Sequence, residues 1–247
     1  MAIFDDWNGY QREVKGEPCA IFLNLGLMRR LPIKDKTSLV NVQVRLNKME
    51  QNEEFALMEL DHALADMESR VRKHVEDQYD GVFAGRVTSN ARRCFYFYVS
   101  DQHINSFRMD SVTPSFDTFE FQVDVQPDPE WKFYQDTLFP GQRDMQLMIN
   151  HRMVDQLAEQ GEQGDASRRV DHWIYFKEEG HRKSFLAAVG KFEFKVEEAP
   201  SARLDEYSFG AQIWRAELMT FESIDRVVLF LMDCAGQYQG QYDGWDS

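Results

Sequence analysis

The first half of the chain combines strand-like alternation with one long helical pattern. Every second residue from Val40 to Leu46 is apolar, and polar residues occupy most of the positions between them. Apolar residues from Leu57 to Val75 recur every three or four positions, which predicts a long helix capped by Asn52 and ending before Asp80. Further strands are expected at 7–14, 19–25, 82–88, 94–99 and 118–125. This half should form a mixed or antiparallel sheet covered by the long helix, with one side of the sheet in solvent.

The second half follows a different order of elements. An amphipathic helix is expected at 145–157, and Gly161 to Asp165 has the composition that ends a helix. The segments that follow are predicted as strand 170–176, helix 182–189, strand 192–196, strand 209–219, a helix starting near Thr220 and strand 237–242. The order β-α-β-β-α-β is the ferredoxin-like arrangement, in which both helices cover one face of an antiparallel sheet. The opposite face would then be free to meet a partner.

The two patterns together predict an α+β protein of two domains. A short helical stretch begins at Pro127 and closes at Phe139-Pro140-Gly141, where proline and glycine interrupt regular structure. We therefore expect an uncharacterised α+β domain over residues 1–140 and a ferredoxin-like domain over residues 141–247. No acidic or basic tail separates from either part, because the surplus of acidic residues is shared between them.

Composition narrows the classes of partner and compartment. With 43% hydrophobic and 13% aromatic residues the chain can bury ordinary cores, whereas its formal net charge of −14 repels the phosphate backbone of nucleic acids. The three cysteines, at positions 19, 94 and 234, form neither a disulfide framework nor a paired metal motif. Neither a leader sequence nor a membrane-spanning apolar run is recognisable. We expect a cytoplasmic protein that binds neither nucleic acid directly nor membranes.

Motifs for catalysis are missing from the sequence. It contains neither a phosphate-binding glycine loop nor a G-x-S-x-G nucleophile turn. His172 and His181 flank Glu178 and Glu179, but this spacing matches no established metal-ligand pattern, so no metal and no cofactor are expected. His172 is interpreted as part of an aromatic strand. The aromatic run from Arg92 to Val99 suggests RNA stacking, but strand packing is the preferred interpretation.

The C-terminal segment holds the candidate binding residues. Tyr238, Tyr242 and Trp245 lie among flexible, uncharged residues, either as a closing edge strand or as an exposed aromatic contact. Structural roles are favoured for the two tyrosines. Trp245 follows Asp243-Gly244, a pair typical of turns, and is the preferred anchor for a partner.

The segment Tyr242-Asp243-Gly244-Trp245 closes the β-α-β-β-α-β unit, and a Gly164-Asp165 break follows its leading helix. With these features, residues 142–247 resemble the regulator of ribonuclease E activity B family of bacteria. The resemblance implies an acidic cytoplasmic protein that binds this endoribonuclease and lowers its activity without chemistry of its own. The tetrapeptide is then the candidate partner-binding site. Two features depart from the family: its long acidic tail has no counterpart after Ser247, and a further domain stands in front.

Residues 1–140 are similar to an uncharacterised bacterial domain family of unknown function. The matching segments are Gly85-Arg-Val-Thr-Ser89, the Phe-Tyr-Phe-Tyr-Val core within Arg93 to Val99, and Asp128-Pro-Glu-Trp131-x-x-Tyr134. That family supplies no activity, but its members end near the Asp-Pro-Glu-Trp segment, which supports the boundary near Pro140.

The leading hypothesis is a non-catalytic regulator that binds a protein partner, such as ribonuclease E or an associated factor, with charge guiding the encounter and Trp245 as anchor. One alternative is a hydrolase that uses paired carboxylates in a cleft between the domains. Another is a structural homo-oligomer joined through sheet edges.

Overall fold

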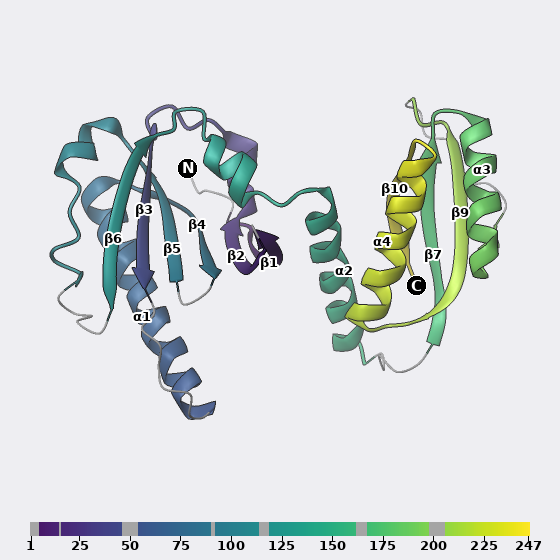
Figure 1. The fold of residues 1–247 in the computed structure, drawn as a ribbon, viewed down its shortest axis with the longest axis horizontal. Helices are drawn as coiled ribbons and strands as arrows, with labels where there is room; N and C mark the ends of the chain where they lie inside the picture. The colour runs from purple at the N-terminus through teal and green to yellow at the C-terminus, as the bar shows by residue number, and fades with distance from the viewer. Residues whose placement is uncertain are drawn as a thin grey trace. The chain divides into compact units, whose positions relative to one another are not determined.

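The chain divides into two compact units, residues 1–145 and residues 146–247 (Figure 1). The computed structural model describes residues 5–14, 16–45, 54–89, 92–113, 119–161, 167–197 and 206–247, with backbone alone for residues 14 and 54–61. The division falls inside helix α2 (Gln142–Glu159), which the sequence assigned to the second domain.

The first unit is built on a six-stranded antiparallel sheet with the strand order β1-β2-β4-β5-β3-β6. Its strands are β1 (Trp7–Val14), β2 (Glu17–Asn24), β3 (Ser38–Arg45), β4 (Val82–Ser89), β5 (Arg92–Val99) and β6 (Glu120–Pro127). Two short 3-10 helices, η1 (Leu25–Arg30) and η2 (Asp101–Ser106), follow β2 and β5. Each expected strand of this half is present, so the predicted antiparallel sheet is confirmed.

Helix α1 (Glu54–Tyr79) covers one face of this sheet (Figure 1). Its apolar stripe meets the inward side chains of the central strands because successive strand residues point to opposite faces. The buried residues shared by this core include Leu64, Met67, Val71 and Val75 from the helix and Val40, Val42, Val44, Phe95 and Phe97 from the sheet. The apolar positions of the alternation predicted over 40–46 therefore form the core face of β3. Three residues named in the sequence predictions, Leu46, Asn52 and Thr118, lie outside the described residues.

The opposite face of the first sheet was expected to be solvated, and this expectation is wrong over its central strands. After β6 the chain returns across that face, and this returning segment forms a short π-helix, η4 (Tyr134–Leu138). Trp131, Tyr134 and Leu138 are fully buried there, and the Trp131 ring stacks on Tyr98 with 3.6 Å between ring centroids. A sheet with two covered faces explains why five consecutive residues at the end of β5 are all buried.

The second unit is a four-stranded antiparallel sheet with the order β10-β7-β9-β8. Its elements are β7 (Ser167–Phe176), α3 (Glu179–Val189), the 3-10 turn η5 (Gly190–Phe192), β8 (Lys195–Val196), β9 (Phe209–Leu218), α4 (Phe221–Gln237) and β10 (Gly240–Asp246). In chain order this is β-α-β-β-α-β, so the predicted ferredoxin-like arrangement is confirmed. The Thr220 hydroxyl caps α4 by accepting from the Ser223 backbone N–H at 3.3 Å, as the sequence indicated.

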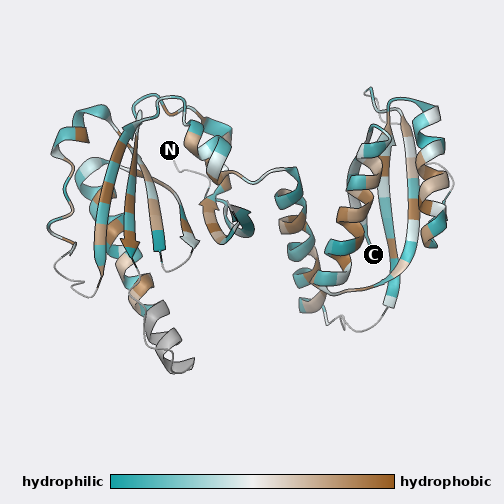
Figure 2. Cartoon of the chain, in the orientation of Figure 1, coloured by the Kyte–Doolittle hydropathy of each residue, from teal (hydrophilic) through white to brown (hydrophobic). Residues whose placement is uncertain are grey.

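The core of the second unit lies between the helices and one face of the sheet. Figure 2 shows α4 with alternating hydrophobic and hydrophilic residues along its length, as expected for a helix with one buried side. The fully buried residues of α4 in this core are Ile224, Val228, Leu231 and Ala235. Helix α2 adds Val154 to the same core. Within the described part of the chain, none of the helices is both long and apolar enough to cross a membrane.

The strand predicted at 192–196 is mostly absent. The chain leaves α3 through η5, and Glu193 takes a left-handed conformation with φ 65°, which breaks an extended path. Only Lys195 and Val196 pair with β9. The two-residue alternation of phenylalanine and charged residues predicted one buried strand face, and this prediction is wrong. Phe192 is 48% exposed, whereas Phe194 is buried.

Candidate functional site

The candidate tetrapeptide, Tyr242-Asp243-Gly244-Trp245, lies inside the edge strand β10 and not after it. The expected strand at 237–242 is displaced, because α4 continues to Gln237 and β10 starts only at Gly240. The pair Asp243-Gly244 was expected to form a turn, but it forms a β-bulge in the β10–β7 ladder. Gly244 has φ 149°, a conformation that glycine adopts far more readily than other residues.

Tyr242 is a core residue that contacts a buried histidine. Its hydroxyl lies 2.9 Å from Nδ1 of His172, and the two residues are 7% and 0% exposed. Burial, with a smaller contribution from the charge of Arg215, lowers the pKa of His172 to about 3, so the imidazole is neutral at physiological pH. Burial also raises the pKa of Tyr242. The interpretation of His172 as part of an aromatic strand is confirmed.

Trp245 is also buried, at 5% exposure, so the exposed ring assumed in the sequence analysis is absent. Its indole N–H donates to Oδ1 of Asn150 in α2 at 2.9 Å. Asn150 in turn donates to Asp225 of α4 at 3.0 Å, and the second oxygen of Asp225 lies 2.6 Å from Nε2 of His151. Trp245 therefore ties β10 to α2 and α4, and its part in partner binding stays a prediction.

The remaining two residues of the tetrapeptide reach the surface. Asp243 is exposed and Gly244 is half-buried. Gly244 lies directly opposite Trp173 in the ladder between β10 and β7. The bulge thus places Asp243 and Gly244 next to the sheet face that carries Trp173. Tyr242 and Trp245 point to the core.

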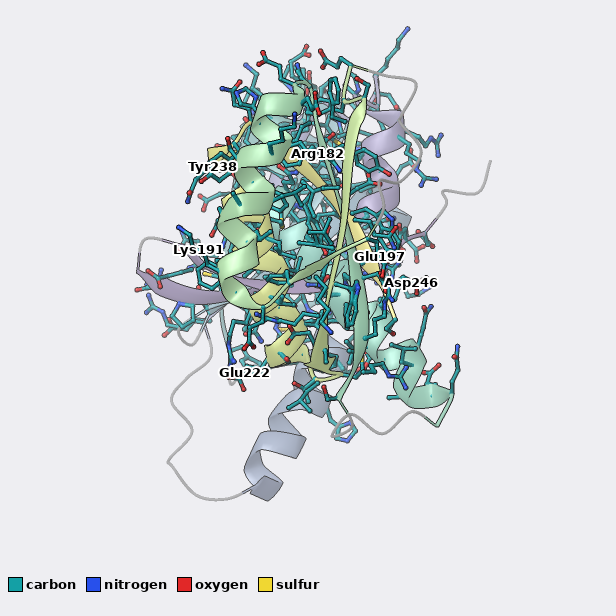
Figure 3. The ribbon with its side chains drawn as sticks, turned by 90° about the vertical axis from the view of Figure 1, so that its right-hand side faces the viewer. Arg182, Lys191, Glu197, Glu222, Tyr238 and Asp246 are labelled. Carbon is teal, nitrogen blue, oxygen red and sulfur yellow. The ribbon has the colours of Figure 1, made fainter. Side chains whose placement is uncertain are left out.

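The sheet of the second unit has one face that lies outside the core cluster between sheet and helices, and we call it the open face. Of its side chains Tyr175 is buried, at 9% exposure. Strand alternation places on it Arg169, Asp171, Trp173 and Tyr175 from β7 and Gln212, Trp214 and Ala216 from β9. None of these side chains belongs to the core cluster between sheet and helices. Figure 3 shows Glu197 and Asp246 on one side of this unit, and Tyr238 after α4 and Lys191 after α3 on the other.

Two cations flank an aromatic ring at the centre of the open face. The Arg169 guanidinium and the Lys195 ammonium each lie 4.5 Å from the ring centroid of Trp214, a distance typical of cation–π contacts. Arg169 also donates to Asp171 at 2.6 Å and to Glu197 at 2.9 Å. Its hydrogen bond to Asp171 lowers the pKa of that carboxyl. The open face therefore combines half-buried aromatic rings with charges held in fixed positions.

Trp173 and Trp214 were not predicted from the sequence as candidate contact residues. Trp173 precedes Ile174 and Trp214 follows Ile213 on the two central strands, so strand alternation places each ring on the sheet face opposite to these isoleucines. Which of the two sheet faces the helices cover could not be read from that alternation. This signal becomes informative only when the side of the helices is known.

The Asp-Pro-Glu-Trp segment of the first unit has a structural role. The Asp128 carboxylate accepts from the Tyr98 hydroxyl at 2.6 Å and from the backbone N–H groups of residues 132 and 133 at 2.8 and 3.0 Å. Trp131 donates its indole N–H to the Lys36 carbonyl at 2.8 Å, and the Tyr134 hydroxyl donates to the Asn24 carbonyl at 2.7 Å. These bonds fasten the returning chain to the sheet, which accounts for the residue types of this motif.

No metal centre forms among the described residues. Within them, no three His, Cys, Asp or Glu side chains are grouped as ligands for a metal ion. His172 is enclosed in the core and contacts Tyr242, whereas Glu178 and Glu179 stand exposed at the start of α3. The structure therefore does not bring the two histidines and two glutamates of that segment together as a cluster.

The fold and the open face define a class: two-unit α+β proteins whose second unit is ferredoxin-like. The chain belongs to a family of unknown function, DUF695, whose family model matches residues 5–139. Residues 148–247 match the model of the family described as regulator of ribonuclease activity B. Both resemblances inferred from the sequence motifs are thereby confirmed.

A crystal structure of an unknown protein from Galdieria sulphuraria is similar to 84% of this chain and 96% of that one, at 10% identity and a TM-score of 0.22. No curated protein matches the sequence.

Proposed function

We propose that the protein is a non-catalytic regulator that binds a ribonuclease, such as ribonuclease E, or a factor associated with it, through its second unit. The observation that carries the proposal is the match of residues 148–247 to a family of ribonuclease regulators. The matched residues coincide with the ferredoxin-like unit, which has its own core and one sheet face that lies outside this core cluster. A regulator of this kind needs a surface for its partner and no reacting groups.

The open face supports a protein partner. Tryptophan, tyrosine and arginine are the residues that most often dominate binding energy at protein interfaces, and Trp173, Trp214 and Arg169 stand together there. The fixed contacts of Arg169 with Asp171 and Glu197 limit the entropy lost when a partner covers them. Through the bulge, Asp243 and Gly244 border the same face. In this proposal Tyr242 and Trp245 hold β10 in place and are not the contacting rings.

The place of action that we propose is the cytoplasm. Cys19, Cys94 and Cys234 are all free thiols, which suits a reducing compartment. A net charge of −14 favours encounter with basic regions of a partner over direct contact with RNA.

The test is a cleavage assay with purified ribonuclease E and a fluorescent RNA substrate, titrated with the full chain. We expect inhibition that saturates with protein concentration and weakens with salt. Trp173→Ala and Trp214→Ala should each weaken inhibition at least about tenfold, as truncated interface tryptophans commonly do. Trp7→Ala, a half-buried tryptophan of the first unit, is the matched control.

Three outcomes separate the parts of the proposal. Absence of binding and of inhibition by the folded wild-type chain would reject the regulator function. Inhibition that is unchanged by both open-face substitutions would support the regulator function and reject the open face as the binding surface. Inhibition lost equally in the Trp7 control would point to the first unit instead.

A further inference from the structure

A charged groove lies on the first unit, between α1 and the sheet. Its volume is about 630 Å³, within the range of small-ligand sites. The charged residues that line it are Arg72, Lys73, Arg86, Arg93, Glu68 and Glu76. These give an excess of two positive charges, in a chain whose formal net charge is −14. Positive charge is thus gathered in one concave place on an otherwise acidic protein.

Arg86 is held in a fixed orientation inside this groove. Its Nη1 donates to Oε2 of Glu68, a carboxylate on α1 that is 8% exposed, and its guanidinium lies 4.5 Å from the ring centroid of Phe22. A guanidinium has five N–H donors in a planar fork, so one carboxylate oxygen does not exhaust it. The ion pair therefore positions Arg86 and leaves donor capacity toward the groove.

The guanidinium of Arg72 is positioned by aromatic rings more than by the carboxylate of Glu76. Its guanidinium lies 4.6 Å from the ring centroid of Phe83 and 5.1 Å from that of Trp7, whereas its nearest contact with Glu76 is 3.7 Å. Stacking on rings fixes the plane of the guanidinium while its N–H edge stays available for an acceptor. Two arginines with preset planes thus come from opposite walls, one from α1 and one from β4.

The remaining two cations differ in how firmly they are held. Nε of Arg93 donates to the Thr88 hydroxyl at 3.1 Å, so this arginine is aligned along the sheet. Lys73 lies 3.2 Å from Asp77 on the same helix and its side chain is 79% exposed, so this ion pair is weak and readily exchanged. A ligand would therefore contact two or three guanidinium groups in fixed orientations and one mobile ammonium group.

We propose that this groove binds a small ligand carrying two neighbouring anionic groups, of the phosphate or carboxylate kind. The planar guanidinium groups of arginine can bind such groups with paired hydrogen bonds, and the positive excess of the groove favours a negatively charged ligand. The ligand is small because the net charge of −14 repels a long polyanion that would extend beyond the groove. This site belongs to the first unit and does not depend on the regulator function of the second.

The experiment is isothermal titration calorimetry of the full chain with pyrophosphate and, separately, with citrate. Binding of either probe should saturate and weaken as salt is raised. The tryptophan fluorescence of the chain should change in parallel, because Arg72 lies over the ring of Trp7, one of its five tryptophans. Lys73→Gln and Arg93→Gln should each weaken binding roughly tenfold, the loss expected for one charge-assisted hydrogen bond. Circular dichroism checks that both variants fold.

Arg30→Gln is the matched control, since it removes an exposed cation of η1 that does not line the groove. Its affinity should stay close to that of the wild type. A response to pyrophosphate alone assigns the phosphate kind, and a response to citrate alone assigns the carboxylate kind. The proposal is overturned if neither probe binds more tightly than about 1 mM. It is equally overturned if Lys73→Gln and Arg93→Gln lose no more affinity than Arg30→Gln.

Discussion

Acid should destabilise the second unit through one side chain, His172. Its pKa of about 3 in the folded chain is well below the ordinary value of 6.5, so the unfolded chain binds the proton more tightly. The stabilisation that neutral His172 provides is complete above about pH 6.5 and is lost as the pH falls from there toward 3. Protonation is unfavourable because the ring is fully buried and its Nε2 has no hydrogen-bond partner among the described residues.

The magnitude follows from the two pKa values. At pH 5 the proton affinity of the unfolded chain lowers the free energy of unfolding by about 2 kcal/mol relative to pH 7.5. The result is nearly the same for any folded pKa below about 4, because the folded imidazole then stays mostly neutral at pH 5. The neighbouring groups are Arg215, which disfavours the charged ring, and Asp171, which favours it.

The measurement compares the wild type with His172→Phe, which keeps an aromatic ring and removes the titration. Hydrogen exchange of the 167–176 peptide, corrected for the intrinsic effect of pH, reports the stability of the second unit. Because the variant leaves the Tyr242 hydroxyl without its partner, it should be less stable at pH 7.5. At pH 5 we expect that gap to close by about 2 kcal/mol. A gap that stays constant between the two pH values would refute the reasoning.

One substitution in each unit tests its packing. Trp245→Phe removes the donor to Asn150 and leaves a small cavity, so we expect a loss of about 1–3 kcal/mol in urea denaturation and faster hydrogen exchange in α2; unchanged α2 exchange would contradict this link. Gly85→Ala would place a Cβ 2.5 Å from the Phe22 carbonyl oxygen, so we expect a Tm drop of several degrees. Gly180→Ala, whose Cβ meets nothing within 4 Å, should raise the Tm or leave it unchanged, and equal effects at both glycines would contradict the steric argument.

Where the sequence predicted well, a periodic pattern coincided with a single buried face. The alternation in β3 and the spacing in α4 each had one core to meet, so pattern and packing agreed. Residues 192–196 show the opposite case: the alternation was regular, but the left-handed Glu193 bends the chain away. That conformation depends on how α3 ends against its neighbours, which a local pattern does not contain.

The candidate site was predictable only in part for a similar reason. The tetrapeptide could be recognised as a motif, but its exposure depends on a bulge in the ladder with β7. An Asp-Gly pair is compatible with a turn and with a bulge, and in this chain it forms a bulge next to Trp245, which donates to Asn150 of α2. The pairing joins residues 95 positions apart in sequence, which periodicity does not reveal.

The hydrogen bonds that join residues 131 and 138 to the early strands and loops of the first unit have a consequence during synthesis. The Tyr10 hydroxyl donates to the Leu138 carbonyl across 128 positions, and Trp131 reaches Lys36 across 95. Contacts of such high sequence separation slow folding, because most of the chain must be confined before they form. On the ribosome, the hairpin made by β1 and β2 therefore emerges early and waits until residue 138 has cleared the exit tunnel. During that interval the uncovered face of the hairpin is exposed to aggregation.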